Sequence, residues 1–233
     1  MMMLFDPLYM ALWLPGVILA TLASFYTKST FSHYSRIAAS SGLTGAEAAR
    51  RLLDYAGVYN VRIEQTGGFL SDHYDPSARV LRLSGDVYGS NSLAAIGVAC
   101  HEAGHAIQHA TGYGPLGLRS ALVPAASLGS NLAFPLLLLG LFLHWQGLVL
   151  IGVGAFALAV LFTLVTLPVE YDASARAKKL MVGCGIVSSR EGRDAGSVLN
   201  AAFMTYVASA VSSLLMLLYF LIRAGLLGGS RRD

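Results

Sequence analysis

The sequence is poor in charged residues, and this shortage restricts the classes of protein to which it can belong. Only 12% of its 233 residues are charged, whereas 55% are hydrophobic and the mean hydropathy is +0.60. This composition is far more apolar than that of a water-soluble domain. The formal net charge of +3 is too small to indicate a nucleic-acid-binding surface. We therefore predict a membrane protein that does not bind nucleic acid.

Cysteine is scarce as well. Cys100 and Cys184 are the only two, and they form no C-x-x-C pair, which argues against a disulfide framework and against a cysteine-based metal site.

The N-terminal apolar run has no basic segment before Leu8 and no small-residue cleavage site after it. We therefore expect an uncleaved transmembrane helix there rather than a signal peptide.

Four apolar stretches are long enough to cross a bilayer. They are Leu8–Tyr26, Ala121–Leu143, Gly147–Leu167 and Phe203–Ile222. The predicted fold is an α-helical integral membrane protein of about four transmembrane helices, with a small α+β domain inserted between the first and the second. The predicted division is a first helix (1–26), the inserted domain (27–120), a transmembrane hairpin (121–167), a helix with a surface segment (168–202), and a last helix with its tail (203–233).

The basic residues indicate an orientation. Residues 27–120 contain eight lysines and arginines and residues 168–202 contain five, which is thirteen of the sixteen in the chain. Four crossings put these two segments on the same side of the membrane. The other three are Arg223, Arg231 and Arg232. The positive-inside rule then predicts that the inserted domain is cytoplasmic and that both termini are outside.

Local patterns predict the order of elements in the inserted domain. The capping box Thr44–Glu47 begins a helix that Gly57 ends. The alternating run Val58–Gln65 predicts a strand, and Phe69–Tyr74 and Ala78–Ser84 predict two more around an Asp-Pro-Ser turn. These patterns predict a small α+β domain in which a helix is followed by three strands.

The segment His101-Glu102-Ala103-Gly104-His105 contains the most specific chemical signal. We expect it on a helix that starts after the N-cap candidates Ser90–Ser92 and ends near Gly112. Positions i and i+4 share a helix face, so His101 and His105 can reach the same ion. Imidazoles suit Zn²⁺, and Glu102 at the rim of that face can take a proton from a metal-bound water. The motif predicts one zinc ion per chain. A helix and strands followed by the His101 helix are the order of a small α+β zincin-like peptidase domain, in which an edge strand pairs with an extended peptide substrate.

A catalytic zinc ion has three protein ligands and one open position. His109 shares the helix face but lies roughly 12 Å along the axis from His101, too far for one ion. Thr111 and Gln108 stand where a metzincin has its third histidine and its glycine. We therefore expect the third ligand outside this helix.

Glutamates are few, and Glu170 is the best candidate among them. Glu47 belongs to the capping box, and Glu64 lies in an alternating strand pattern. Glu170 directly follows the third apolar stretch, on a short helix that Pro168 is expected to begin. The alternative is that Glu170 only interacts with the dipole of that helix.

Several motifs together resemble the YugP-type family of bacterial membrane zinc metallopeptidases. The resemblance covers roughly residues 27–221, with matching runs at 43–49, 68–76, 94–110, 122–124 and 167–174. It implies a neutral zinc peptidase of the bacterial inner membrane, with His101 and His105 as ligands and Glu102 as catalytic base. The chain is more distantly similar to the HtpX/Ste24 membrane peptidases, whose later helix carries E-x-x-x-D. Glu170 matches that glutamate, but Ser174 replaces the aspartate, which leaves Asp172 as a substitute.

The leading hypothesis is a membrane-embedded zinc endopeptidase that cleaves peptides, unfolded proteins or membrane-protein segments at the bilayer surface. His73, on the predicted edge strand, is either a surface histidine or a donor to the developing oxyanion.

A metal-ion transporter is one alternative function, although the apolar stretches contain no acidic residue that could relay cations. An inactive peptidase-like scaffold is another, and the intact H-E-x-x-H motif argues against it.

Overall fold

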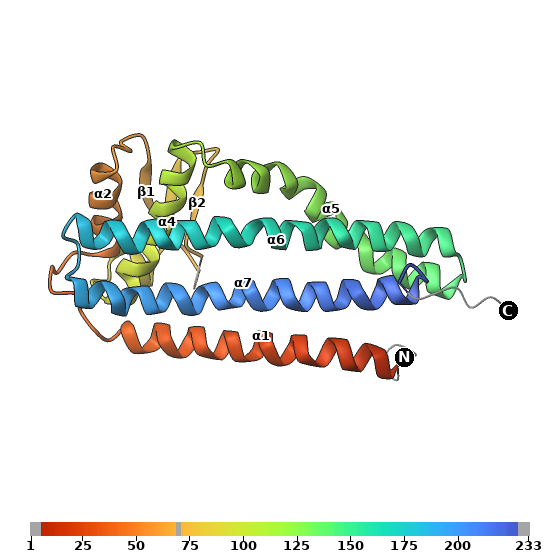
Figure 1. The fold of residues 1–233 in the computed structure, drawn as a ribbon. Helices are drawn as coiled ribbons and strands as arrows, with labels where there is room; N and C mark the ends of the chain where they lie inside the picture. Colours follow the sequence, from red (N-terminus) through yellow and green to blue (C-terminus); the bar gives the residue numbers. More distant parts are fainter. Residues whose placement is uncertain (1–5, 69–70, 228–233) are drawn as a thin grey trace. The chain divides into compact units, whose positions relative to one another are not determined.

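The computed structural model describes residues 6–68 and 71–227. Residues 69 and 70 of the predicted second strand lie outside these ranges, as do Arg231 and Arg232. The described chain is mostly helical, with one small sheet (Figure 1).

Four helices are long and apolar enough to cross a membrane (Figure 1). They are α1 (Pro7–Tyr34), α5 (Gly114–Phe142), α6 (Gln146–Gly183) and α7 (Ser189–Arg223). The four predicted stretches fall largely within these helices, so the prediction of about four transmembrane helices is confirmed by length and composition. With 38 residues, α6 is about 57 Å long, whereas the hydrocarbon core is about 30 Å thick. Part of α6 therefore extends beyond the apolar layer.

The prediction that Pro168 begins a separate short helix is wrong. Pro168 lies inside α6, which continues without a break from Gln146 to Gly183. Proline removes one backbone hydrogen bond, a loss that usually ends a helix in water. Near a membrane, packing against other helices allows the helix to continue through it. Glu170 is therefore in a helix interior, and the helix-dipole interpretation of its position does not apply.

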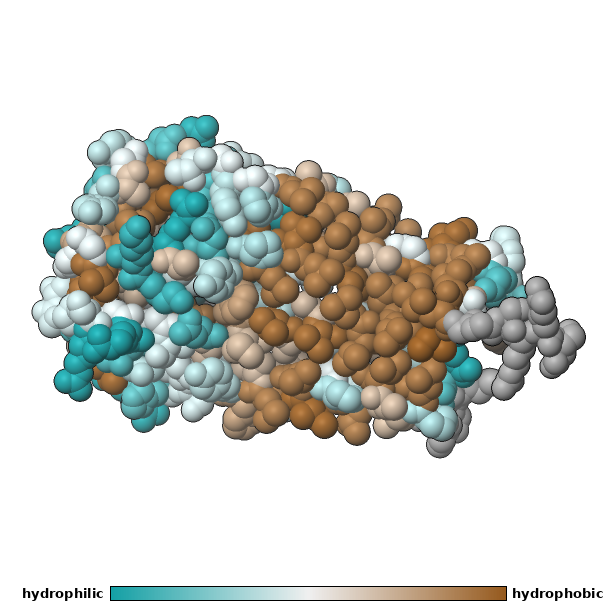
Figure 2. Space-filling view, viewed as in Figure 1, coloured by the Kyte–Doolittle hydropathy of each residue, from teal (hydrophilic) through white to brown (hydrophobic). Residues whose placement is uncertain are grey.

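The chain divides into two compact units. The first comprises residues 1–22, 118–167 and 205–233, and the second comprises 23–117 and 168–204. Phe134, Phe156 and Phe220 pack edge to face in the first unit. In Figure 2, most of the visible surface over the helices of this unit is coloured brown, which marks hydrophobic residues. Its many exposed apolar side chains, such as Ile151, suit a lipid environment.

The second unit contains the sheet. In chain order its elements after α1 are α2 (Gly45–Tyr55), β1 (Arg62–Thr66), β2 (His73–Asp75), β3 (Val80–Ser84), α3 (Gly85–Tyr88) and α4 (Leu93–Ala110). The strand order is β1-β3-β2, with β1 parallel and β2 antiparallel to β3. The observed β1 and β3 begin later than predicted. β2 lies at an edge of the sheet.

The predicted helix and turn signals are present in the structure. Thr44 and Glu47 form the capping box of α2, and Gly57 follows this helix with φ +74°. In the turn between β2 and β3, one carboxylate oxygen of Asp75 accepts hydrogen bonds from the backbone N–H groups of Ser77 and Ala78. Hydrogen bonds led by that from the Ser77 hydroxyl hold the pKa of Asp75 well below its usual value.

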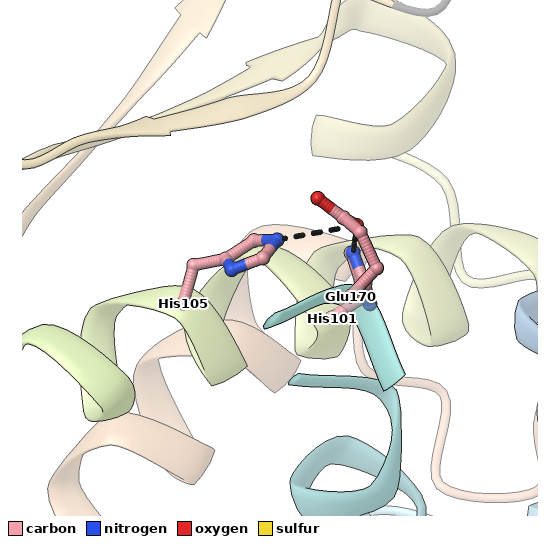
Figure 3. Close-up of side chains that lie close together, drawn as sticks. All are labelled: His101, His105 and Glu170. Carbon is pink, nitrogen blue, oxygen red and sulfur yellow. Dashed lines mark hydrogen bonds and ion pairs between the residues drawn. The ribbon is translucent and has the colours of Figure 1, made fainter. Parts of the chain in front are cut away.

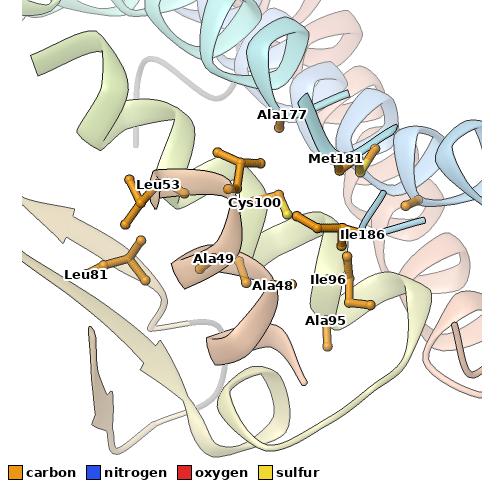
Figure 4. Packing of buried hydrophobic residues seen from close by; sticks show 14 of the residues in the cluster. Ala48, Ala49, Leu53, Leu81, Ala95, Ile96, Cys100, Ala177, Met181 and Ile186 are labelled. Carbon is orange, nitrogen blue, oxygen red and sulfur yellow. The ribbon is translucent and has the colours of Figure 1, made fainter. Parts of the chain in front are cut away.

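The core of the second unit lies between α2 and α4 and extends to the end of α6 (Figure 4). Leu53 of α2 and Ile96 of α4 are buried, as are Ala177 and Met181 of α6. The backbone of α6 approaches α4 at Gly104, where an added Cβ would lie 2.6 Å from the carbonyl oxygen of Ala173. This close approach holds the Glu170 turn of α6 against the histidine face of α4.

Candidate metal centre

The helix α4 presents both histidines of the motif on one face, as the spacing predicts. Their ring centroids are 4.8 Å apart. The helix is capped at its start by the Ser92 hydroxyl, which accepts a hydrogen bond from the Ala95 N–H. Gly112 follows its end with φ +63°, a conformation that favours glycine. The predicted start and stop signals of this helix are thus confirmed.

The carboxylate of Glu170 on α6 faces both imidazoles (Figure 3). Its Oε2 atom lies 3.2 Å from Nε2 of His101 and 3.6 Å from Nε2 of His105. The candidate ligand atoms of the three residues lie within 4.8 Å of one another. Glu170 and His105 are only 2% and 7% exposed. The structure therefore brings together the three residues that the sequence predicts as metal ligands.

The chemistry of these three side chains fits a zinc ion. Two imidazoles and one carboxylate form a common catalytic zinc set, and ligands bound about 2 Å from a tetrahedral ion lie roughly 3.3 Å apart. The opposite ring nitrogens also have partners, as they do in protein zinc sites. Nδ1 of His101 is 3.0 Å from the Ser174 hydroxyl, and Nδ1 of His105 is 3.0 Å from Oε1 of Gln108.

Ser174 and Asp172, the two candidates for a supporting residue, take different positions. Ser174 contacts His101 directly. Asp172 instead accepts hydrogen bonds from the Gln108 amide and from Arg176. Sequence reasoning missed the role of Gln108, which it treated only as a departure from the metzincin motif. Its spacing of three residues from His105 was the available signal.

Glu102 lies beside the metal-ligand group and contacts the edge strand. Its Oε2 accepts a hydrogen bond of 3.1 Å from the backbone N–H of Tyr74 on β2. Burial raises the pKa of Glu102 above its usual value, although His101 and His105 act in the opposite direction. A raised pKa suits a carboxylate that both accepts and returns a proton.

The two other histidines near the motif lie outside the metal-ligand group. Nδ1 of His109 is 2.8 Å from the Tyr74 hydroxyl. His73 is exposed on β2, with Nδ1 at 2.7 Å from the Ser71 carbonyl oxygen and Nε2 at 3.5 Å from Nη1 of Arg82. A neutral His73 therefore has its single N–H turned to Ser71 and would have to break this contact to donate elsewhere.

The remaining glutamates have other partners, which supports the choice of Glu170. Glu47 accepts hydrogen bonds from Thr44 in the capping box. Glu64 forms an exposed ion pair with Arg62. Glu191 accepts hydrogen bonds from the backbone N–H groups of residues 40 and 188.

A glycine at the contact between α4 and α6 gives a direct test of this geometry. We expect Gly104→Ala to weaken zinc binding about tenfold, because strain of about 1–3 kcal/mol from overpacking would separate the histidines from Glu170. Gly117→Ala is the matched control, since nothing lies within 4 Å of an added Cβ there. Chelator competition measures both affinities. Equal affinities in the two variants would show that this close approach does not hold the ligands together.

Comparison with known proteins agrees with the site. Residues 9–225 match the model of a family described as "Putative neutral zinc metallopeptidase". A curated relative, "Putative membrane protease YugP" of Bacillus subtilis (strain 168), is 46% identical over 215 residues, which cover 92% of this chain and 96% of the relative. No solved structure matches the chain. The family match and the identity extend over nearly the whole sequence, and the chain belongs to the family described as "Putative neutral zinc metallopeptidase".

Proposed function

We propose that the protein is a membrane-embedded zinc endopeptidase with Glu102 as its general base. The observation that carries this proposal is the convergence of His101, His105 and Glu170, with Glu102 next to them on α4. A zinc ion held by the first three would supply a Lewis acid that polarises the scissile carbonyl and acidifies a water molecule. One ion per chain is expected.

Glu102 carries the proton in this mechanism. Its carboxylate takes a proton from the attacking water and then gives it to the leaving amine. The Tyr74 N–H restrains one carboxylate oxygen, at 3.1 Å. The other oxygen is left to accept the proton, and burial, which raises the pKa of Glu102, favours proton uptake.

The strand β2 is the proposed binding edge for the peptide. Among the residues that the structure describes, it pairs with β3 alone. The Tyr74 N–H points away from β3 and toward Glu102, which indicates that the unpaired edge faces the catalytic residue. An extended peptide added to this edge would present its backbone to Glu102. His73 on the same strand is the proposed donor to the oxyanion, after release from Ser71.

The proposed location is the cytoplasmic face of the bacterial inner membrane. Glu170 is only three residues beyond the apolar stretch that ends at Leu167. A site so close to a membrane span suits membrane-protein segments and unfolded chains as substrates, with the bilayer itself as a partner. The clustering of thirteen of sixteen basic residues in 27–120 and 168–202 supports the cytoplasmic side.

The activity is tested with the purified protein and an unfolded substrate such as denatured casein. We expect cleavage that a zinc chelator stops and added zinc restores. Cleavage that is insensitive to the chelator would contradict a zinc mechanism.

Orientation is tested by thiol labelling in intact cells. In a Cys184→Ala background, Ala78→Cys puts an exposed thiol in the turn between β2 and β3. The remaining Cys100 is buried. A membrane-impermeant reagent should label Ala78→Cys only after lysis, because the turn is proposed to be cytoplasmic. Labelling before lysis would reverse the orientation.

A further inference from the structure

We infer that Gln108 is a positioning residue that determines which ring nitrogen of His105 carries hydrogen and so keeps Nε2 available to a metal ion; this rests on the proposed zinc function. Gln108 is completely buried, and it lies three residues after His105 on α4. Its amide connects His105 with two groups on α6.

The orientation of the Gln108 amide follows from these two groups. Its Nε2 lies 2.8 Å from the carbonyl oxygen of Val169 and 2.8 Å from Oδ2 of Asp172. A backbone carbonyl and an ionised carboxylate can only accept hydrogen bonds. The NH₂ end of the amide must therefore face α6, and the oxygen must face His105.

This orientation in turn determines the hydrogen position on His105. Oε1 of Gln108 can only accept, so Nδ1 of His105, at 3.0 Å, has to be the donor. A neutral imidazole with its hydrogen on Nδ1 has a free electron pair on Nε2. That is the nitrogen that faces Glu170. With the amide reversed, the NH₂ group would favour hydrogen on Nε2, and this tautomer cannot bind a metal through Nε2.

Asp172 holds the arrangement from the other side. Its Oδ2 also accepts a hydrogen bond of 2.6 Å from Nε of Arg176. Since Gln108 has no exposed surface, water cannot replace its contacts. The corresponding partner of His101 is different: the hydroxyl of Ser174 can donate or accept, so it does not select a tautomer. The selection is therefore specific to His105.

The test replaces the amide in the full-length protein and measures zinc affinity by chelator competition. Gln108→Met has a similar shape without hydrogen-bonding atoms, and we expect zinc affinity to fall about 10–100-fold, the usual effect of losing a partner behind a metal ligand. Gln65→Met is the control, because Gln65 is an exposed glutamine on β1.

A second variant separates positioning from packing. In Gln108→Glu, a protonated carboxyl group keeps one oxygen that can only accept from His105 Nδ1, and its O–H can donate to Oδ2 of Asp172 in place of the amide. We expect Gln108→Glu to bind zinc more tightly than Gln108→Met, within about tenfold of the wild type, since the partner of Nδ1 is retained. Normal affinity in Gln108→Met would overturn the inference, as would a Gln108→Glu protein that binds zinc no more tightly than Gln108→Met. Absence of zinc from the wild type would instead contradict the proposed function.

Discussion

Glu102→Gln is expected to abolish peptide cleavage while zinc remains bound. The amide has nearly the same shape, and its oxygen can still accept the hydrogen bond from the Tyr74 N–H. It cannot accept the proton of the attacking water, and losing a general base typically lowers the rate about 10²–10⁴-fold. Metal analysis and a cleavage assay on the same preparation measure the two properties separately.

The histidine variants provide the contrast. His101→Ala and His105→Ala each remove one of the two imidazoles that the Glu170 carboxylate faces. Both should lose zinc and cleavage together, because these side chains are proposed as ligands. A Glu102→Gln protein that cleaves at the wild-type rate would show that Glu102 is not the general base.

Glu170→Gln is expected to lower zinc affinity more than about 100-fold, beyond the usual effect of losing a residue that only supports a ligand. The substitution removes the negative charge that lies 3.2 Å and 3.6 Å from the two imidazoles. Chelator competition on the purified protein gives the affinity, and cleavage should fall with zinc occupancy.

Glu191→Gln is the matched control for this experiment. Glu191 accepts hydrogen bonds from residues 40 and 188 and is not part of the metal-ligand group. Its substitution should change neither zinc binding nor cleavage. Normal zinc affinity in Glu170→Gln would mean that another residue is the third ligand, with Asp172 as the next carboxylate along α6.

The features that the sequence predicts well are those determined by neighbouring residues. The i and i+4 spacing of His101 and His105 places both on one face of α4, and the capping box at Thr44 forms as its pattern requires. Glu170 was predicted from a different kind of information, the scarcity of other glutamates. The elimination works because Glu47 has an obvious local partner.

The features that could not be predicted depend on how α4 and α6 pack. The partners of Gln108 on α6 are Val169 and Asp172, more than sixty residues away in the sequence. Their positions follow from the close approach at Gly104, for which a lone glycine in a helix gives no specific signal. Pro168 misled the prediction because proline ends helices in water more reliably than it does near a membrane.

The most direct test of the central claim is a zinc titration of the metal-free protein during cleavage of denatured casein. The proposed site of His101, His105 and Glu170 predicts that activity rises from zero and reaches its maximum at one zinc ion per chain. Glu102→Gln should bind the same single ion without activity. Cleavage by the metal-free wild type, or a failure of the wild type to bind zinc, would contradict the account.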